Sequence, residues 1–383
     1  MVAAPLTGGV PECDYFPLRH QGWFMDASLL LKGTRGRWLV TGAAGFIGSH
    51  LLETLALAGQ VVLGVDNFVT GKRENIESVS GALARRGIDL NFVEGNICDP
   101  AIAGRLIRGV DYVLHQAAIG CTQRSIEDPL GSFVSNVDGF LRILEAARLE
   151  KVKAFVYASS SSVYGGRAAL PRREGRLGRP LSPAAASKAA DELLAAVYAR
   201  CYGTRTVGLR YFNVFGPRQD ADGPHAAVIP RWIAAMLRGE RVYINGDGLS
   251  SRDFCFVDNV VQANIRAALH APADVDGTLL NIGAGEQVTL LELFRLLKEL
   301  LQEYRSFIAD IEPTLREFRP GDIRHSLASI EKARRLIGYA PTHHLEAGLR
   351  IALGWYVAHD PLGAPRQESV RLPPTGRRHR GHA

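Results

Sequence analysis

Short apolar runs alternate with helical stretches along the first half of the chain. Five runs rich in β-branched or aromatic residues predict strands: RWLVT (37–41), VVLGVD (61–66), LNFVEGN (90–96), VDYVLHQAA (110–118) and VKAFVYASS (152–160). The intervals have helical spacing, first over residues 47–58. This alternation predicts parallel strands joined by right-handed helical crossovers, and therefore an α/β fold with a doubly wound parallel sheet.

The alternation becomes irregular after about Arg210. Segments such as YFNVFGPRQD, VYINGDG and RDFCFVDNV are typical of loops, short strands and brief helices. We therefore expect an N-terminal extension (1–32), a sheet domain (33–209) rejoined by about 258–288, a smaller C-terminal α/β substrate lobe (210–360) and a flexible tail (361–383). A ligand would bind in the crevice between the two lobes.

Composition and charge exclude several other classes. With 46% hydrophobic residues over 383 positions, the chain can bury a full core. The apolar runs are shorter than the ~20 residues of a membrane span, and residues 1–32 lack the pattern of a signal peptide. Part of the net charge of +6 comes from Arg377, Arg378 and Arg380 near the C-terminus. The remaining bias favours an anionic small molecule, and we expect neither a nucleic-acid nor a membrane partner.

The five cysteines are scattered and form no CxxC pair. This spacing indicates neither a disulfide framework nor a zinc site, so we expect no metal and a reduced, cytoplasmic setting.

A glycine-rich turn follows the first predicted strand. Thr41 ends that strand, and Gly42, Gly45 and Gly48 open the next helix in the sequence GAAGFIG. Such a turn lets a pyrophosphate approach the backbone at a helix N-terminus. Asp66 closes the second strand about 20 residues later, where a carboxylate accepts hydrogen bonds from an adenosine ribose. A carboxylate would also repel a 2′-phosphate, so the pattern predicts NAD rather than NADP.

Further motifs extend this pattern from about Arg37 to Tyr356. They read VTGAAGFIGSH, VDNFVTG, VEGNICD, HQAA, YASSSSVYG, SPAAASK, LRYFNVFGPRQ, INGDGLSSRDFCFVDNV and FRPGDIRHS. The chain thereby resembles the extended short-chain dehydrogenase/reductase family, and within it bacterial UDP-N-acetylglucosamine 4-epimerases. The resemblance implies an NAD-binding Rossmann domain, a UDP-sugar substrate and a homodimer. Its four-helix interface would use helices near Val134–Arg148 and Ala184–Tyr202.

The resemblance also implies roles for individual residues. Ser160 and Lys188 match catalytic positions. The matching cofactor positions are Gly42, Gly45, Phe46, Ile47, Gly48, Asp66, Asn67, Asn96, Ile97, Ala117, Ala118, Lys188 and Tyr211. The matching substrate positions are Ser125, Ser160, Ser161, Ser162, Asn213, Val228, Tyr243, Arg252, Arg319, Asp322 and Ser326. Arg252 and Arg319 would clamp the diphosphate, because a guanidinium matches its geometry. Tyr243 is equally compatible with an ordinary strand position.

The acid-base position of the family is occupied by alanine. The implied reaction oxidises C4 of the sugar with NAD, rotates the 4-keto sugar and returns hydride to the other face. Family members use a tyrosine four residues before the lysine, on the same helix face. Here that position is Ala184, with Lys188 in register. Three explanations stay open: an engineered inactivating substitution, a natural inactive relative, or an enzyme that uses another acid-base group.

Two other positions bear on the reaction and the sugar. Dehydratases carry an Asp-Glu pair after the catalytic serine, whereas this chain has Ser161, Ser162 and Val163, so dehydration is disfavoured. Ser326 matches a position where a small residue admits an N-acetylated sugar. We therefore expect UDP-GlcNAc and UDP-GalNAc, with the corresponding uronic acids next. The alternatives are UDP-glucose or UDP-glucuronate epimerisation, decarboxylation or dehydration of a nucleotide sugar, and a non-catalytic protein that binds NAD and a nucleotide sugar.

Overall fold

The computed structural model describes residues 29–166, 169–176, 178–222, 226–272, 277–318 and 323–360. Most of the expected N-terminal extension and the whole expected tail lie outside these ranges. No helix within them is long and apolar enough to cross a membrane.

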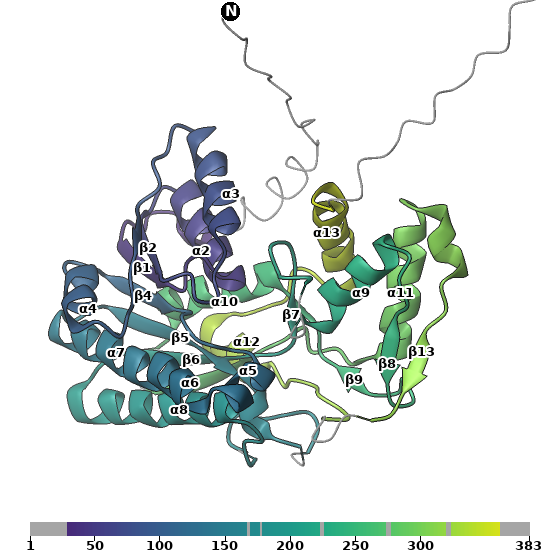
Figure 1. The fold of residues 1–383 in the computed structure, drawn as a ribbon. Coiled ribbons are helices and arrows are strands. Elements are labelled where there is room, and N and C mark those ends of the chain that lie inside the picture. Colours follow the sequence, from purple (N-terminus) through teal and green to yellow (C-terminus); the bar gives the residue numbers. More distant parts are fainter. Residues whose placement is uncertain are drawn as a thin grey trace, which may run out of the picture.

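A seven-stranded parallel sheet forms the larger part of the molecule (Figure 1). Its strand order is β11-β6-β5-β4-β1-β2-β3, so strands are added on one side of β1 up to β3 and on the other side from β4 onward. Crossover connections of this kind define a doubly wound sheet, and the predicted fold class is confirmed. The strands are β1 (Arg37–Thr41), β2 (Val61–Asp66), β3 (Phe92–Glu94), β4 (Tyr112–His115), β5 (Ala154–Ser160), β6 (Thr206–Tyr211) and β11 (Thr278–Ile282).

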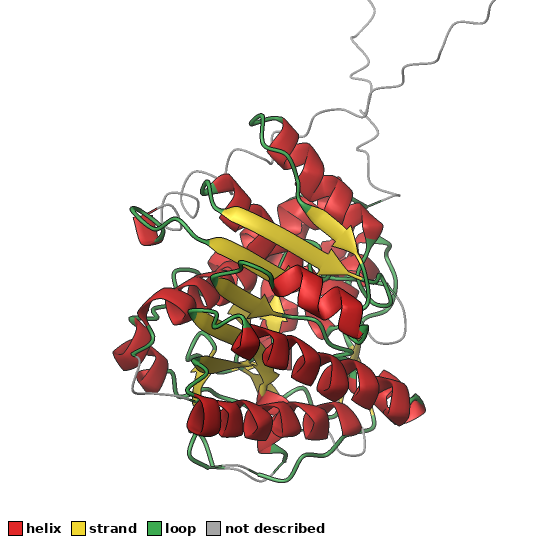
Figure 2. Ribbon diagram, turned by 90° about the vertical axis from the view of Figure 1, so that its left-hand side faces the viewer, coloured by secondary structure: helices red, strands yellow, loops and turns green. Residues whose placement is uncertain are grey.

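Helices cover both faces of this sheet (Figure 2). One face carries α2 (Phe46–Leu57), α3 (Arg73–Ala84), α10 (Val257–His270) and α12 (Glu331–Ile337). The other face carries α4 (Pro100–Ile107), α7 (Gly139–Leu149) and α8 (Pro183–Tyr202). Two separate apolar clusters form as a result, one on each face. Because both faces are covered, a central strand of the sheet is buried on both sides instead of in alternation, as β6 shows by being buried throughout.

The second lobe is built around a helical core. Its long helices are α9 (Val228–Leu237), α11 (Leu290–Gln302) and α13 (Leu345–Ala358), and Figure 1 places them together on one side of the molecule. Large apolar side chains from all three, including Trp232, Phe294 and Leu353, form one buried cluster. Three two-stranded sheets complete the lobe: β7 (Val214–Phe215) with β10 (Cys255–Phe256), β9 (Ser251–Arg252) with β12 (Val288–Thr289), and β8 (Tyr243–Asn245) with β13 (Thr314–Arg316).

Two regions differ from the helices expected from the sequence. The helix predicted near residues 134–148 is divided into α6 (Pro129–Phe133), a π-helical turn η1 (Val134–Asp138) and α7, and it follows the short α5 (Thr122–Glu127). The segment RDFCFVDNV, expected to hold only short elements, opens the 14-residue helix α10. The remaining short helices are η2 (Ser161–Tyr164) and η3 (Ser306–Asp310).

Candidate active site

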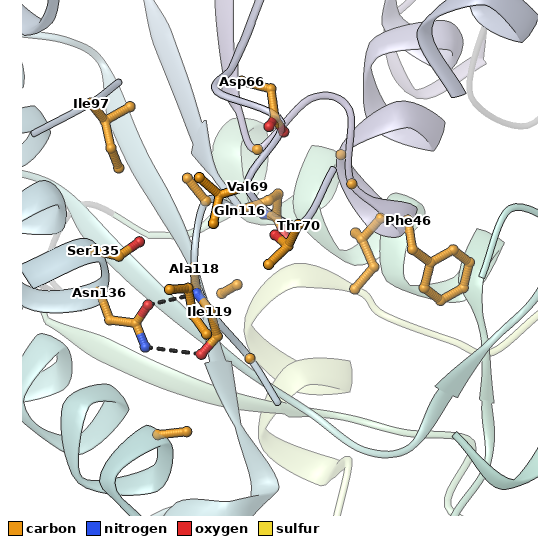
Figure 3. A pocket seen from close by; sticks show the side chains of 18 of the residues that line it. Phe46, Asp66, Val69, Thr70, Ile97, Gln116, Ala118, Ile119, Ser135 and Asn136 are labelled. Carbon is orange, nitrogen blue, oxygen red and sulfur yellow. Dashed lines mark hydrogen bonds between the residues drawn. The ribbon is translucent and has the colours of Figure 1, made fainter. Parts of the chain in front are cut away.

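A cavity of about 440 Å³ lies at the carboxyl ends of the parallel strands (Figure 3). The end of β1 and the end of β4 both border it, so it occupies the place where the strand order reverses. Ligands of open α/β sheets bind at this position. All the residues expected at the cofactor line the cavity, together with Ser160, Ser162 and Ala184.

The glycine-rich turn forms one wall of the cavity. Gly42 has a φ of +68°, and a Cβ there would lie 2.7 Å from the backbone nitrogen of Ala117. A Cβ on Gly48 would lie 2.0 Å from the carbonyl oxygen of Gly42. Gly45 is the N-cap of α2 and offers no side chain to the first N–H groups of the helix. These donors and the helix dipole therefore suit an anionic group such as a pyrophosphate.

Asp66 is held firmly at the end of β2. Its Oδ2 accepts a hydrogen bond from the backbone of Ala44 at 3.0 Å, and its Oδ1 accepts one from Phe68 at 2.8 Å. Burial raises the pKa of this carboxyl group, while the backbone donors oppose the shift. The carboxylate is thus oriented by the backbone on the wall of the cavity.

Asn136 connects the wall after β4 to helix α8. Its Oδ1 accepts from the backbone nitrogen of Ile119 at 2.7 Å, and its Nδ2 donates to the carbonyl of Ile119 at 3.2 Å (Figure 3). The same Nδ2 donates to Ser187 Oγ at 2.9 Å. Asn136 belongs to η1, so the π-helical turn brings this side chain to the cavity.

Helix α8 begins beside the cavity and presents Ala184 and Lys188 to it. Ser182 caps the helix by accepting from the backbone of Ala185 at 3.2 Å, and Pro183 occupies the first helical position. Ala184 and Lys188 are four residues apart and both line the cavity. The methyl group of Ala184 therefore occupies the position from which a longer side chain would enter the cavity.

The serines after β5 differ in their positions. Ser160 Oγ accepts hydrogen bonds from the backbone nitrogen of Ser162 at 3.1 Å and from Ser162 Oγ at 2.9 Å. Ser160 and Ser162 line the cavity, whereas Ser161 does not. Ser125 lies next to the start of α8, where its Oγ accepts from the backbone of Ala184 at 3.1 Å, but it is not part of the cavity lining.

Buried charged groups lie beneath α8. Lys188 Nζ forms an ion pair with Asp191 Oδ2 at 3.1 Å. One turn further, Glu192 accepts two hydrogen bonds from the guanidinium of Arg210, at 2.8 and 2.7 Å. His115 is fully buried and contacts Thr41 Oγ1 at 3.0 Å. Burial and the nearby ammonium of Lys188 lower its pKa to about 3, so this histidine is neutral.

The expected substrate residues of the second lobe do not line this cavity. Asn213 donates to the carbonyl of Asp253 at 3.0 Å, and the guanidinium of Arg316 lies 3.2 Å above the ring of Tyr243. Arg252 donates to the carbonyl of Ser251 at 2.9 Å. The other residues of this set that the structure describes are Val228, which opens α9, and the buried Ser326. Arg319 and Asp322 lie outside the described residues.

Several cavity residues were not identified from the sequence. They are Val65, Val69, Thr70, Gly95, Gln116, Ile119, Gly120, Thr122, Ser135, Asn136, Ala158 and Ser159. Val65, Gln116, Ala158 and Ser159 lie near the carboxyl ends of predicted strands, so the rule that ligands bind at these ends would have found them. No sequence signal marked Ser135 or Asn136.

Comparison with protein families decides the assignment. The model of the "NAD dependent epimerase/dehydratase family" matches residues 38–283. The chain belongs to this family. The match covers the glycine turn, all of the parallel sheet except Arg37, and helix α8, which are the elements that form the cavity. NAD is therefore the cofactor.

Individual relatives in the family act on different UDP-sugars. The chain is 36% identical to UDP-glucose 4-epimerase of Mycolicibacterium smegmatis, over 82% of this chain and 96% of that one. It is similar to a structure of UDP-N-acetylglucosamine 4-epimerase from Methanobrevibacter ruminantium with UDP-N-acetylmuramic acid (TM-score 0.77, 35% identity, 85% and 99% coverage). It is also similar to a tyrosine-to-phenylalanine variant of UDP-glucuronic acid 4-epimerase from Bacillus cereus, solved with a fluorinated UDP-sugar and NAD (TM-score 0.73, 31% identity, 83% and 98% coverage).

Proposed function

We propose that this chain binds NAD and a UDP-N-acetylhexosamine for 4-epimerisation, and that Ala184 limits its turnover. The observation that carries the proposal is the arrangement around the cavity: Ser160, Ala184 and Lys188 all line it, with the last two one helical turn apart. A tyrosine in place of Ala184 would have its hydroxyl near both of the other side chains.

The cavity fits the cofactor by its own features. Gly42 and Gly48 let the backbone turn tightly, and the N-terminus of α2 offers free donors for a pyrophosphate. Asp66 offers its carboxylate to a ribose, and Lys188 offers an ammonium. The cofactor supplies hydride acceptance and donation, while the side chains of this chain must supply binding, orientation and proton transfer.

Proton transfer is the function for which the cavity lacks a suitable group. The ionisable side chains that line it are Asp66, Lys188 and Tyr211. Asp66 is occupied by backbone donors, and Lys188 is ion-paired. Burial raises the pKa of Tyr211, and its hydroxyl donates to Gln116 Oε1 at 3.0 Å, so this phenol stays protonated. Loss of a general base typically costs ~10²–10⁴ in rate, and we expect a reduction of that order here.

The choice of sugar rests on Ser326 and on the residues after Ser160. The family resemblance implies that a small side chain at the position of Ser326 leaves volume for an acetamido group, and no carboxylate follows Ser160 to support dehydration. UDP-N-acetylhexosamine uronic acids fit the same argument. Among the relatives, a UDP-N-acetylglucosamine 4-epimerase has a named substrate that agrees with this choice.

A binding experiment tests the cofactor and the sugar separately. Ligands released from denatured protein are identified by mass spectrometry, and we expect NAD and a UDP-sugar. UDP-GlcNAc and UDP-glucose are then competed for the purified protein by calorimetry, with Ser326→Tyr as the variant that fills the expected space. UDP-GlcNAc should bind better to the original protein, and the variant should lose that preference. A clear preference of the original protein for UDP-glucose would contradict the assignment of the sugar.

We also propose a homodimer formed by the helices next to the cavity. Exposed apolar side chains gather on α6 and α8: Leu130 is 80% exposed, Phe133 53% and Leu193 68%. Apolar surface of this kind is usually covered by a partner. Leu193→Arg should convert the dimer into a monomer in light scattering, whereas Leu315→Arg, on the strand β13, should not. A monomeric original protein would refute this proposal.

A further inference from the structure

A buried carboxylate lies directly behind the lysine of the cavity. Asp191 follows Lys188 by three residues on α8, and their ion pair has side-chain exposures of 0% and 9%. Lys188 lines the cavity, but Asp191 does not. A buried ion pair is usually no more stabilising than well-packed apolar residues, so stability alone does not explain this carboxylate.

Asp191 has no other hydrogen-bond donor in the described part of the chain. Its Oδ2 accepts from Lys188 Nζ, and its Oδ1 is buried without a partner there. The neighbouring carboxylate of Glu192 is already engaged by Arg210 and by Ser159 Oγ at 2.5 Å. Asp191 is therefore the carboxylate that balances the charge of Lys188.

The sheet beneath α8 provides no second anion for Lys188. His115 and Tyr157 are paired across β4 and β5, and both are buried. His115 is neutral, as its lowered pKa shows. Burial raises the pKa of Tyr157 well above its ordinary value, so its phenol is neutral as well. The charge that Lys188 presents to the cavity is thus controlled by Asp191.

We propose that Asp191 is a positioning residue that makes the site favour NAD⁺ over NADH by neutralising Lys188. The two cofactor forms differ by a hydride, and hence by the positive charge on the nicotinamide ring. An unbalanced ammonium on the cavity wall disfavours the cationic form, and a paired ammonium does so much less. With a methyl group at position 184, no phenolate can supply the negative charge instead. This inference rests on the proposed function in one respect, namely that the cavity binds NAD.

The experiment compares dissociation constants for NAD⁺ and NADH in the full-length protein. Asp191→Asn keeps the size of the side chain and removes its charge. We expect the ratio of the two constants to move about 10-fold toward NADH, as for loss of a unit charge roughly 12 Å away at an effective dielectric constant near 20. Asp222→Asn is the matched control, because it removes a carboxylate from the exposed pair with Arg238. Its ratio should equal that of the original protein.

A double-variant cycle separates charge control from a structural role. In the Lys188→Met background, Asp191 has lost its cation and takes up a proton, so adding Asp191→Asn should change the ratio by less than about twofold. An equal shift in both backgrounds would overturn the proposal, because it would show that Asp191 acts without Lys188.

The original protein provides a test that needs no variant. Burial raises the pKa of Asp191 to about 6, although the ammonium of Lys188 opposes the shift. The carboxylate is charged above that pH, so the preference for NAD⁺ should be full at pH 8 and should fall as the pH drops below 6. A ratio that is constant between pH 5 and 8, or unchanged in Asp191→Asn, overturns the proposal. Failure of both cofactor forms to bind refutes the proposed function instead.

Discussion

Replacing Ala184 by tyrosine should create an active epimerase. Side chains four residues apart on a helix have their Cβ atoms about 5–6 Å apart, so the new phenol would lie close to the ammonium of Lys188. At about 6 Å and an effective dielectric constant near 20, that ammonium stabilises a phenolate by about 3 kcal/mol, or about 2 pKa units. A phenol with an ordinary pKa near 10 would then titrate near 8. The charge of Asp191, 3.1 Å from Lys188, reduces part of this effect.

The expected gain in kcat is ~10²–10⁴, the usual contribution of a positioned general acid-base group. Conversion of UDP-GlcNAc to UDP-GalNAc is followed by NMR, because the two sugars differ in their anomeric signals. Ala184→Phe is the control, since it adds the ring without the hydroxyl. Calorimetry with NAD should give similar affinities for all three proteins, which separates chemistry from binding.

Two results would refute this reasoning. Equal activity of Ala184→Phe and Ala184→Tyr would mean that the hydroxyl does not transfer the proton. Full activity of the original protein, comparable with that of Ala184→Tyr, would mean that another group already does so.

Two further predictions concern the framework of the cavity. Gly48→Ala places a Cβ 2.0 Å from the carbonyl oxygen of Gly42, so it should lower the free energy of unfolding in urea by about 1–3 kcal/mol and weaken NAD binding. Gly104→Ala is the control, because the space around this residue of α4 is open; it should leave the free energy of unfolding unchanged or raise it, and should not affect NAD binding. Glu192→Ala leaves the buried guanidinium of Arg210 without its carboxylate, so it should lower the free energy of unfolding in urea by about 3–5 kcal/mol. A decrease below about 1 kcal/mol would show that the ion pair is not needed for stability.

The sequence predicted the parallel sheet well because its strands are buried on both faces. The predicted strands RWLVT and VVLGVD coincide with β1 and β2, and the predicted helix 47–58 differs from α2 by one residue at each end. Periodic apolar patterns and a glycine turn are local signals, and the residues that they marked, Gly42, Gly48 and Asp66, line one cavity in the structure. Such signals are strong wherever a short segment must satisfy its own backbone and bury its own side chains.

Features that depend on distant contacts were not predictable in the same way. The π-helical turn η1 places Asn136 where it forms hydrogen bonds with Ile119 and Ser187, and no local sequence pattern predicts these hydrogen bonds. The sequence also did not predict that the ion pair between Lys188 and Asp191 is buried, because charged side chains on a helix are normally exposed to solvent. Assignments in the second lobe, such as Tyr243, came only from family resemblance, and they stay predictions.

The late position of β11 in the chain limits when the sheet can fold during synthesis and where the protein can be truncated. This edge strand pairs with β6, yet it is separated from β6 in the chain by α9, β8 and α10. A ribosome must therefore translate α9 and the short strands β7 to β10 of the second lobe before the sheet can close. A fragment ending near residue 211 would expose the unpaired edge of β6, which is buried throughout in the whole chain, and should aggregate rather than persist as an autonomous unit.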